Sequence, residues 1–263
     1  MMEKKSRRRP DDLPMLAPCR ELEVRAPLRW LGLGWRDLRA APRQSLSYGL
    51  MMVGLSYLIS AAAWIWGNLG LYLGLVSGFV FVGPWLAMTL YAISQRLERG
   101  EAPSLKRSLA DAGQSIGSAM VFAVILVVVL LVWARAANTL YIFFPQISNP
   151  GWRELAWFFG IGSAVGALFC LVIFAASAFS LPMLMDRRAD AVTAVITSVN
   201  AVLRNKRAMA VWALIIVTSV VLGLVTAWLA FAIVLPVIGH ATWHGYRETI
   251  DAEEWPLIER ESS

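Results

Sequence analysis

Residues 231–247, FAIVLPVIGHATWHGYR, combine a long apolar run with a proline and the only two histidines of the chain. The run is interrupted at Pro236 and ends at Arg247, where a polar tail begins. A segment of this length and composition, closed by a positive charge, is typical of a helix that crosses a bilayer. It therefore predicts the last span of a membrane protein, with the two histidines close to the aqueous phase.

Outward from this stretch, four long segments carry no Asp, Glu, Lys or Arg, and they contain 52, 23, 31 and 39 residues. Because about 20 apolar residues cross a bilayer, the first and last segments are each long enough for two spans. The predicted fold is all-α: a polytopic membrane helical bundle of six transmembrane helices in three hairpins, with short amphipathic cytoplasmic interface helices. The predicted spans are 46–66, 71–94, 116–133, 155–185, 208–224 and 227–246.

The positive residues are divided unequally between the predicted loops. Of the 24 Lys and Arg residues, 22 lie on one side of a six-span arrangement, and only Arg135 and Arg153 lie on the other. By the positive-inside rule, this division predicts a multi-pass protein of the inner (cytoplasmic) membrane with both termini in the cytoplasm. The net charge of +6 is thus explained by topology, and we expect no nucleic-acid partner.

Three regions follow from the distribution of charge. Residues 1–26 are basic, contain several prolines and have no hydrophobic period, so we expect a disordered tail. Residues 27–247 form the membrane domain. Residues 248–263 are acidic, and we expect a solvated cytoplasmic tail.

A weak internal repeat accompanies the three predicted hairpins. A short amphipathic segment precedes each pair of spans, at 27–41, 103–112 and 189–204. The first carries Trp30 and Trp35 among arginines, and we expect it to lie in the cytoplasmic headgroup plane. The second span of each pair contains a proline that we expect to kink the helix: Pro84, Pro182 and Pro236.

Glycines at helical spacing mark predicted helix contacts. Gly70, Gly74 and Gly78 follow one another at intervals of four residues, and Gly162 and Gly166 form a GxxxG pair. Small residues on one face let two membrane helices approach closely. We expect these faces to pack against another helix of the chain or across a homodimer.

The histidine pair is the only candidate for a metal or haem site. His240 and His244 are four residues apart, so they point the same way on a helix. Glu248, Asp186 or a second subunit would have to supply further ligands. The alternative is an aromatic and polar belt that anchors the end of the span, where water reaches both rings. We expect this second arrangement, with no bound metal and no cofactor.

The chain resembles a bacterial family of predicted integral membrane proteins of unknown function. The resemblance rests on residues 32–38 (GLGWRDL), 78–84 (GFVFVGP) with 94–101 (SQRLERGE), and 239–247 (GHATWHGYR), and extends over about residues 27–248. It implies six helices. Some family members are labelled as cytochrome c oxidase subunits, but two histidines cannot furnish the ligands of a haem–copper catalytic subunit.

No sequence motif indicates a reaction. Walker loops, HExxH, GxSxG and CxxC patterns are all absent, and the predicted spans hold ionisable residues only at their edges. We therefore expect a non-enzymatic scaffold or assembly partner, in contact with the lipid bilayer and with other membrane proteins or a second copy. One alternative is a carrier or channel for an apolar or weakly polar solute. A second alternative is a haem- or metal-binding accessory protein.

Overall fold

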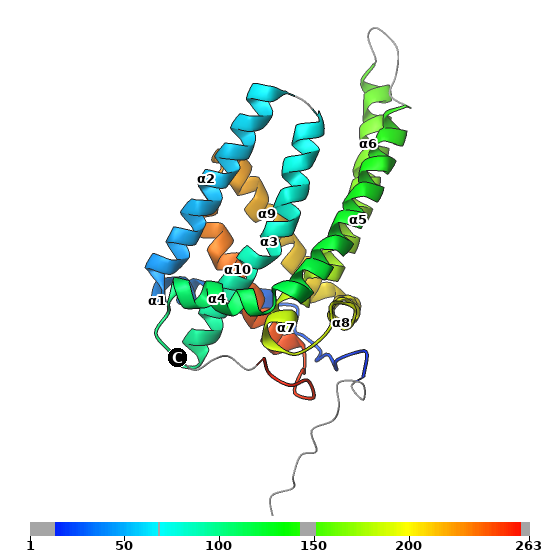
Figure 1. Ribbon diagram of the computed structural model, residues 1–263. Helices are drawn as coiled ribbons and strands as arrows, with labels where there is room; N and C mark the ends of the chain where they lie inside the picture. Colours follow the sequence, from blue (N-terminus) through cyan, green and yellow to red (C-terminus); the bar gives the residue numbers. More distant parts are fainter. Residues whose placement is uncertain (1–13, 68, 143–150, 259–263) are drawn as a thin grey trace, which may run out of the picture.

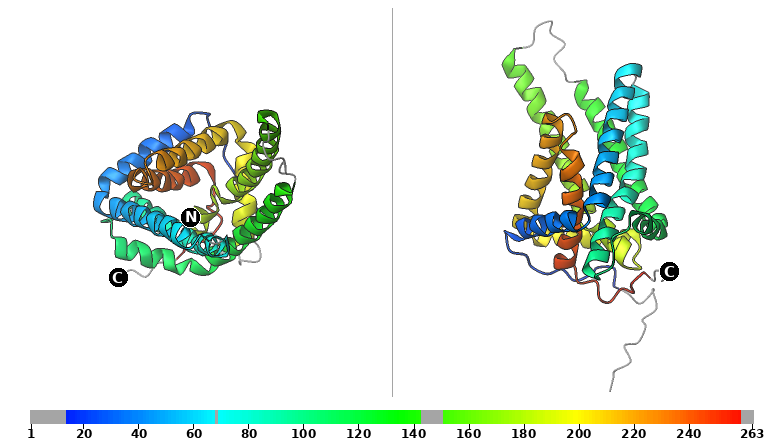
Figure 2. Two further views of the ribbon diagram at one scale, coloured as in Figure 1. Left: turned by 90° about the horizontal axis from the view of Figure 1, so that it is seen from above. Right: turned by 90° about the vertical axis from the view of Figure 1, so that its left-hand side faces the viewer.

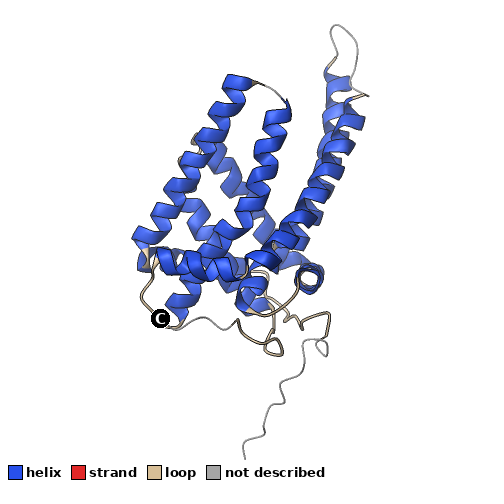
Figure 3. Ribbon diagram, in the orientation of Figure 1, coloured by secondary structure: helices blue, strands red, loops and turns tan. Residues whose placement is uncertain are grey.

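The computed structural model describes residues 14–67, 69–142 and 151–258, and at residues 63, 66, 69–82 and 141 it describes the backbone alone. Over these residues the chain is helical and forms no β-strand (Figure 3). The helices are α1 (Ala26–Ala40), α2 (Pro42–Trp66), α3 (Leu69–Glu98), α4 (Leu105–Gln114), α5 (Ile116–Tyr141), α6 (Trp152–Ser177), α7 (Ser180–Asp186), α8 (Ala191–Arg204), α9 (Lys206–Val225) and α10 (Phe231–Thr249). The predicted all-α class is confirmed.

The long helices are arranged as three antiparallel pairs, α2 with α3, α5 with α6, and α9 with α10 (Figures 1 and 2). The first and third pairs stand close together, and α10 packs against both α2 and α3. The α5–α6 pair leans away from them at its upper end (Figure 1). Its contacts with the rest of the chain are made mainly with α3, α4, α7 and α8.

Four helical stretches are long and apolar enough to cross a membrane, within the residues whose side chains are described. They are Pro42–Ala62, Ile116–Leu140, Trp152–Asp186 and Lys206–Val225. These four correspond to the first, third, fourth and fifth spans expected from the sequence. The remaining two expected spans fall on α3 and α10, which form the other halves of two hairpins.

The short helices α1, α4, α7 and α8 gather at one end of the molecule, across the lower ends of the long helices (Figure 1). We call this end the base. Here α1 packs most extensively against α10. Trp30 is fully buried, with its ring 5.5 Å from that of Trp212 and 6.1 Å from that of Phe179. Trp30 therefore belongs to the protein core, because one face of α1 is apolar enough to join it, whereas Trp35 is 40% exposed. The position of α1 in the headgroup plane stays a prediction.

The two terminal segments are ordered where they are described. The backbone N–H of Asp251 donates to Pro18 O at 2.9 Å, and that of Arg20 donates to Thr249 O at 2.8 Å. Ala17 and Trp255 are buried. Residues 14–25 thus correct the predicted disordered tail, and residues 250–258 correct the predicted solvated tail; residues 1–13 and 259–263 lie outside the description.

The three prolines that were expected to kink a span lie at different positions in their helices. Pro84 lies inside α3 and Pro236 inside α10. Pro182 lies in the first turn of α7, after a break between α6 and α7 at residues 178–179. A proline ring clashes with the carbonyl four residues earlier, here that of Ala178, so the helix breaks before it. The expected span 155–185 is therefore made of two helices, α6 and α7, within one candidate membrane span.

The last hairpin turns later than expected. Its loop runs from residue 226 to residue 230, and Ala227 and Trp228 have φ values of 48° and 72°. Trp228 donates its backbone N–H to Gly223 O at 2.7 Å. The final helix consequently begins at Phe231 and not at residue 227.

The closest helix contacts are made at glycines that the sequence did not single out. A Cβ atom on Gly34 of α1 would lie 2.6 Å from Val237 O and 2.8 Å from Ala241 N of α10. A Cβ atom on Gly49 of α2 would overlap the backbone of Ala232, also on α10. Both glycines therefore allow backbones to approach closely.

The structure bears differently on the two sets of glycines that were expected to pack against another helix. A Cβ atom on Gly162 or Gly166 would meet no described atom within 4 Å. Hence no described helix of the chain packs on this pair, and its contact with another chain remains a prediction. The surroundings of Gly70, Gly74 and Gly78 lie outside the described residues.

Candidate functional site: a buried polar cluster at the base

Polar and charged side chains from five helices meet at the base, where the lower ends of α3, α7 and α10 come together. We call them the basal cluster. On α10 the spacing of four residues places both histidines on one face, which looks toward α1, α2 and α3. The cluster comprises Asp37, Ser45, Ser94, Gln95, Glu98, Asp186, Arg187, His240, His244, Tyr246 and Arg247.

His240 is fully buried and joins three helices. Its Nε2 lies 2.9 Å from Oγ of Ser45 on α2, and its Nδ1 lies 2.8 Å from Oγ of Ser94 on α3. A neutral imidazole has one donor and one acceptor nitrogen, and a hydroxyl can serve either role, so both ring nitrogens are satisfied. Neither nitrogen is left free for a metal or a haem iron.

His244 is held by carboxylates one turn further along. Its Nε2 lies 2.8 Å from Oδ2 of Asp37 on α1, and its Nδ1 lies 3.9 Å from Oε1 of Glu98 on α3. The side chains of His244 and Asp37 are 7% and 6% exposed. A carboxylate so far from water is stable only when it is paired and hydrogen-bonded, which is what the imidazole N–H provides.

Asp186, at the end of α7, receives the greatest number of hydrogen bonds in the cluster. Gln95 Nε2 donates to its Oδ1 at 2.8 Å, and Tyr246 Oη and Arg187 Nε donate to its Oδ2 at 2.9 and 3.0 Å. Arg247 lies 3.8 Å from Asp186 and 3.7 Å from Glu98. These bonds tie the ends of α3, α7 and α10, one from each hairpin region, into a single network.

The sequence placed the two histidines correctly at the end of the last helix but described their surroundings wrongly. They were expected to be reached by water and to need no buried partner, whereas both are buried and hydrogen-bonded. Glu248, a suggested metal ligand, instead pairs with Arg29 at 2.5 Å and accepts from Trp30 Nε1 at 2.9 Å. Among the described side chains, no group of three or more His, Cys, Asp and Glu residues is placed to hold a metal ion.

Several partners were missed by sequence reasoning. Ser45, Ser94 and Gln95 lie near the ends of apolar segments, and Asp37 lies beside Arg36 in the first amphipathic segment. Polar residues at such positions are ordinarily solvated. Only the fold brings them to α10. A usable signal was the position of Asp186, which directly follows a charge-free run and precedes two arginines.

A second polar junction fastens the N-terminal segment to α8. The backbone N–H of Ala17 donates to Thr197 Oγ1 at 3.1 Å, and that of Leu22 donates to Asn205 Oδ1 at 2.8 Å. Burial raises the pKa of the nearby Cys19 thiol, more than a hydrogen bond from Asn200 lowers it. This thiol is therefore less reactive than a free cysteine.

Comparison with known proteins identifies one family. Residues 71–186 match the model described as "Predicted integral membrane protein (DUF2189)". The match confirms, over these residues, the family that the sequence predicts. No curated protein and no solved structure matches the chain.

Proposed function

We propose that this integral membrane protein, which matches the DUF2189 family over residues 71–186, is a non-enzymatic scaffold or assembly partner. In this proposal six helices cross the bacterial inner membrane as three hairpins, with both termini in the cytoplasm. The base then lies on the cytoplasmic side. The α5–α6 hairpin is the part that binds another membrane protein or a second copy.

The observation that carries the proposal is the exposure of α6. This helix has 26 residues, none of which is buried. Trp157, Phe159 and Leu168 are 64%, 59% and 61% exposed, and Gly162 and Gly166 are open to approach. Lipid tails are as apolar as these side chains, so apolar surface alone does not drive helices together in a bilayer. The open glycine pair instead allows the close backbone packing that holds two membrane helices together.

The six-span part of the proposal is supported by α3 and α10. Each runs antiparallel to a helix that qualifies as a membrane span, α2 and α9 respectively (Figure 2). Helix α3 has 30 residues, enough to cross a bilayer core of about 30 Å at 1.5 Å per residue. Helix α10 has 19 residues and nearly crosses it. The polar cluster at the end of α10 coincides with the side that carries most of the positive residues.

Site-specific photo-cross-linking tests the scaffold role. A photoreactive phenylalanine analogue replaces Phe159, on the glycine face of α6, in cells that express the full chain. We expect a cross-link to a protein, identified by mass spectrometry, that disappears when Gly166→Leu is added. The matched control places the same analogue at Leu58 of α2, which is 66% exposed, and adds Gly54→Leu on that helix. Adducts with lipid alone at both positions would contradict the scaffold role.

A carrier for an apolar solute is the second candidate, and a cavity supports it. Between α1, α9 and α10 lies a cavity of about 420 Å³, lined almost wholly by apolar side chains with Thr218 and Ser219 among them. Uptake of an apolar fluorescent solute into proteoliposomes would favour this role. Val237→Trp, which fills the cavity, should then abolish uptake.

A further inference from the structure

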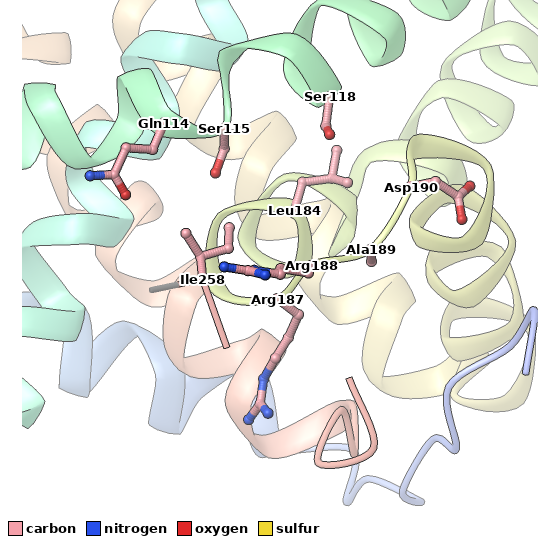
Figure 4. Close-up of a pocket in the computed structure, with 9 residues that line it drawn as sticks. All are labelled: Gln114, Ser115, Ser118, Leu184, Arg187, Arg188, Ala189, Asp190 and Ile258. Atoms are coloured by element: carbon pink, nitrogen blue, oxygen red, sulfur yellow. The ribbon is translucent and has the colours of Figure 1, made fainter. Parts of the chain in front are cut away.

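A cavity of about 820 Å³ opens at the base between the α4–α5 junction, the end of α7 and the C-terminal segment (Figure 4). Its charged side chains are engaged by the protein itself. Arg187 points away from the space in Figure 4 and donates to Trp255 O at 2.9 Å. Asp190 turns aside and caps α8, and Arg188 also interacts within the protein. The three charged lining residues are thus all committed to contacts inside the molecule.

The cavity of about 420 Å³ between α1, α9 and α10 is of another kind, because it is apolar and open at its rim. We call it the α9–α10 groove. Leu214 of α9 and Ile233 of α10 line it and are 66% and 46% exposed. Leu31 of α1 lines it from the side of the base (Figure 1). The groove is therefore a surface feature of the helices, closed below by α1.

The packing of α10 explains why protein does not fill the groove. Another side of α10 meets α2 at very short range, since a Cβ atom on Gly49 would overlap the backbone of Ala232. That contact holds α10 against α2. The side of α10 that carries Ile233 and Val237 consequently lines the groove.

The depth of the groove follows from α9, which is a candidate membrane span over Lys206–Val225. The ring of Trp212 packs on Trp30 of α1, and Trp212 lies about 9 Å from the start of the span at 1.5 Å per residue. With α9 crossing the bilayer, α1 lies close to the headgroups. The groove residues from 214 onward then lie deeper, among the acyl chains.

Helix α1 carries a positive charge on the face that borders the groove. Leu31, Trp35 and Arg39 follow one another at intervals of four residues, so they lie along one face of α1. The guanidinium carbon of Arg39 lies 5.3 Å from the centre of the Trp35 ring, one turn from Leu31. Stacking uses the flat face of a guanidinium and leaves its N–H edge free to donate.

No described carboxylate neutralises this guanidinium. The nearest acid in the sequence, Asp37, faces α10 instead, where it bonds His244. Among the described residues, Arg39 forms no ion pair. An exposed cation beside a tryptophan is thus available to an anion at the edge of the groove.

We propose that the α9–α10 groove binds an anionic phospholipid, with an acyl chain between Leu214 and Ile233 and the phosphate against Arg39 and Trp35. Tryptophan and arginine at headgroup depth suit the glycerol and phosphate of such a lipid, and the apolar groove suits its chain. A helix of another protein fits less well, because the rim carries large side chains and not the small residues that bring helices together. The site rests on α9 being a membrane span and is independent of the scaffold role proposed for α6.

Native mass spectrometry of the delipidated full chain in a neutral detergent tests the proposal. The probes are dioleoyl phosphatidylglycerol and dioleoyl phosphatidylcholine, which have the same chains and differ in net charge. We expect one molecule of phosphatidylglycerol to bind about fivefold more tightly than phosphatidylcholine, since Arg39 meets the net negative charge of its headgroup.

Two variants separate the headgroup from the chain. Arg39→Gln should weaken phosphatidylglycerol binding about tenfold, since hydrogen bonds to charged groups are the stronger kind. Leu214→Trp places an indole over the mouth of the groove. It should weaken both lipids about threefold or more, because the acyl chain loses apolar contact area.

Each variant has a matched control. Arg107→Gln removes a positive charge from an exposed position on α4, which packs on α3 and α5. Val217→Trp adds the same indole to α9 at a position that is 57% exposed and does not line the groove. Both controls should change lipid binding by less than about twofold, as surface substitutions ordinarily do.

The outcomes decide each part of the proposal. Equal losses for Arg39→Gln and Arg107→Gln, or equal binding of the two lipids, would overturn the phosphate contact, because only a general effect would remain. Equal losses for Leu214→Trp and Val217→Trp would overturn the place of the acyl chain. A dimer that Leu214→Trp dissociates would show that a second copy fills the groove, and would overturn the site. Lipid binding without solute uptake would support the site and count against the carrier.

Discussion

Asp37 and His244 make a buried hydrogen-bonded pair at the base, with 2.8 Å between Oδ2 and Nε2. The intact pair and the loss of one partner have very different effects on the free energy of unfolding. A buried pair contributes little compared with an apolar pair of the same shape, but removing one partner leaves a buried group without compensation and costs about 3–5 kcal/mol. The pair therefore selects one arrangement of α1 on α10 more than it adds to the total stability.

A double-mutant cycle tests this pair. We expect His244→Ala to lower the free energy of unfolding by about 3 kcal/mol, because Asp37 loses its main partner. Asp37→Ala should cost less, because it removes the buried carboxylate itself and leaves an imidazole that has lost one hydrogen bond. The double variant should lose clearly less than the sum. Thermal unfolding in detergent gives the measurement.

The exposed pair Arg20–Asp251 provides the control for that cycle. Its atoms are 3.5 Å apart and its side chains are 54% and 40% exposed. Arg20→Ala should therefore change stability by less than about 1 kcal/mol. If the effects of Asp37→Ala and His244→Ala simply add, the two residues are not coupled and the role assigned to them is wrong.

At the scale of the element, the sequence predicted helices well and their neighbours poorly. Apolar runs and charge-free lengths placed the starts of α2, α5, α6 and α9 within four residues, because length and hydropathy are local properties. The burial of Trp30, the break before Pro182 and the partners of His240 depend on which helices meet. Local sequence carries no such information, so the basal cluster could not be assembled from it.

Helix α1 shows how a single backbone contact decides packing. Gly32 and Gly34 are two residues apart on the same helix, but only Gly34 faces the backbone of α10. We expect Gly34→Ala to destabilise the protein by about 1–3 kcal/mol, because its Cβ would lie 2.6 Å from Val237 O and the helices would have to separate.

The matched change at the neighbouring glycine should have the opposite sign. A Cβ atom on Gly32 meets no atom within 4 Å, and alanine favours a helix over glycine by roughly 0.5–1 kcal/mol. Gly32→Ala should therefore raise the thermal unfolding temperature slightly. Two variants of equal and small effect would mean that α1 does not pack on α10 as described.

At the scale of the whole molecule, all three hairpins end at the same side. The four short helices and both described terminal segments lie there (Figure 1), as does the basal cluster that joins α1, α2, α3, α7 and α10. The bilayer core cannot solvate such groups, so this end belongs at a water interface. The opposite ends of α2, α5 and α6 expose apolar side chains, among them Trp64, which is 88% exposed, and Trp152, which is 89% exposed.

Reporter fusions test the six-span topology that follows. Fusions after Glu101, between α3 and α4, and after Asp190, before α8, should report the cytoplasm, because both positions lie at the base with most of the positive residues. A fusion at Pro150, between α5 and α6, should report the periplasm. With only four spans, in which neither α3 nor α10 crosses, both termini would share one side, but the fusions after Glu101 and Asp190 would lie on the other side. If only one of α3 and α10 failed to cross, the five crossings would put the two termini on opposite sides. A periplasmic signal after Asp190, or opposite signals at the two termini, would therefore exclude three complete hairpins.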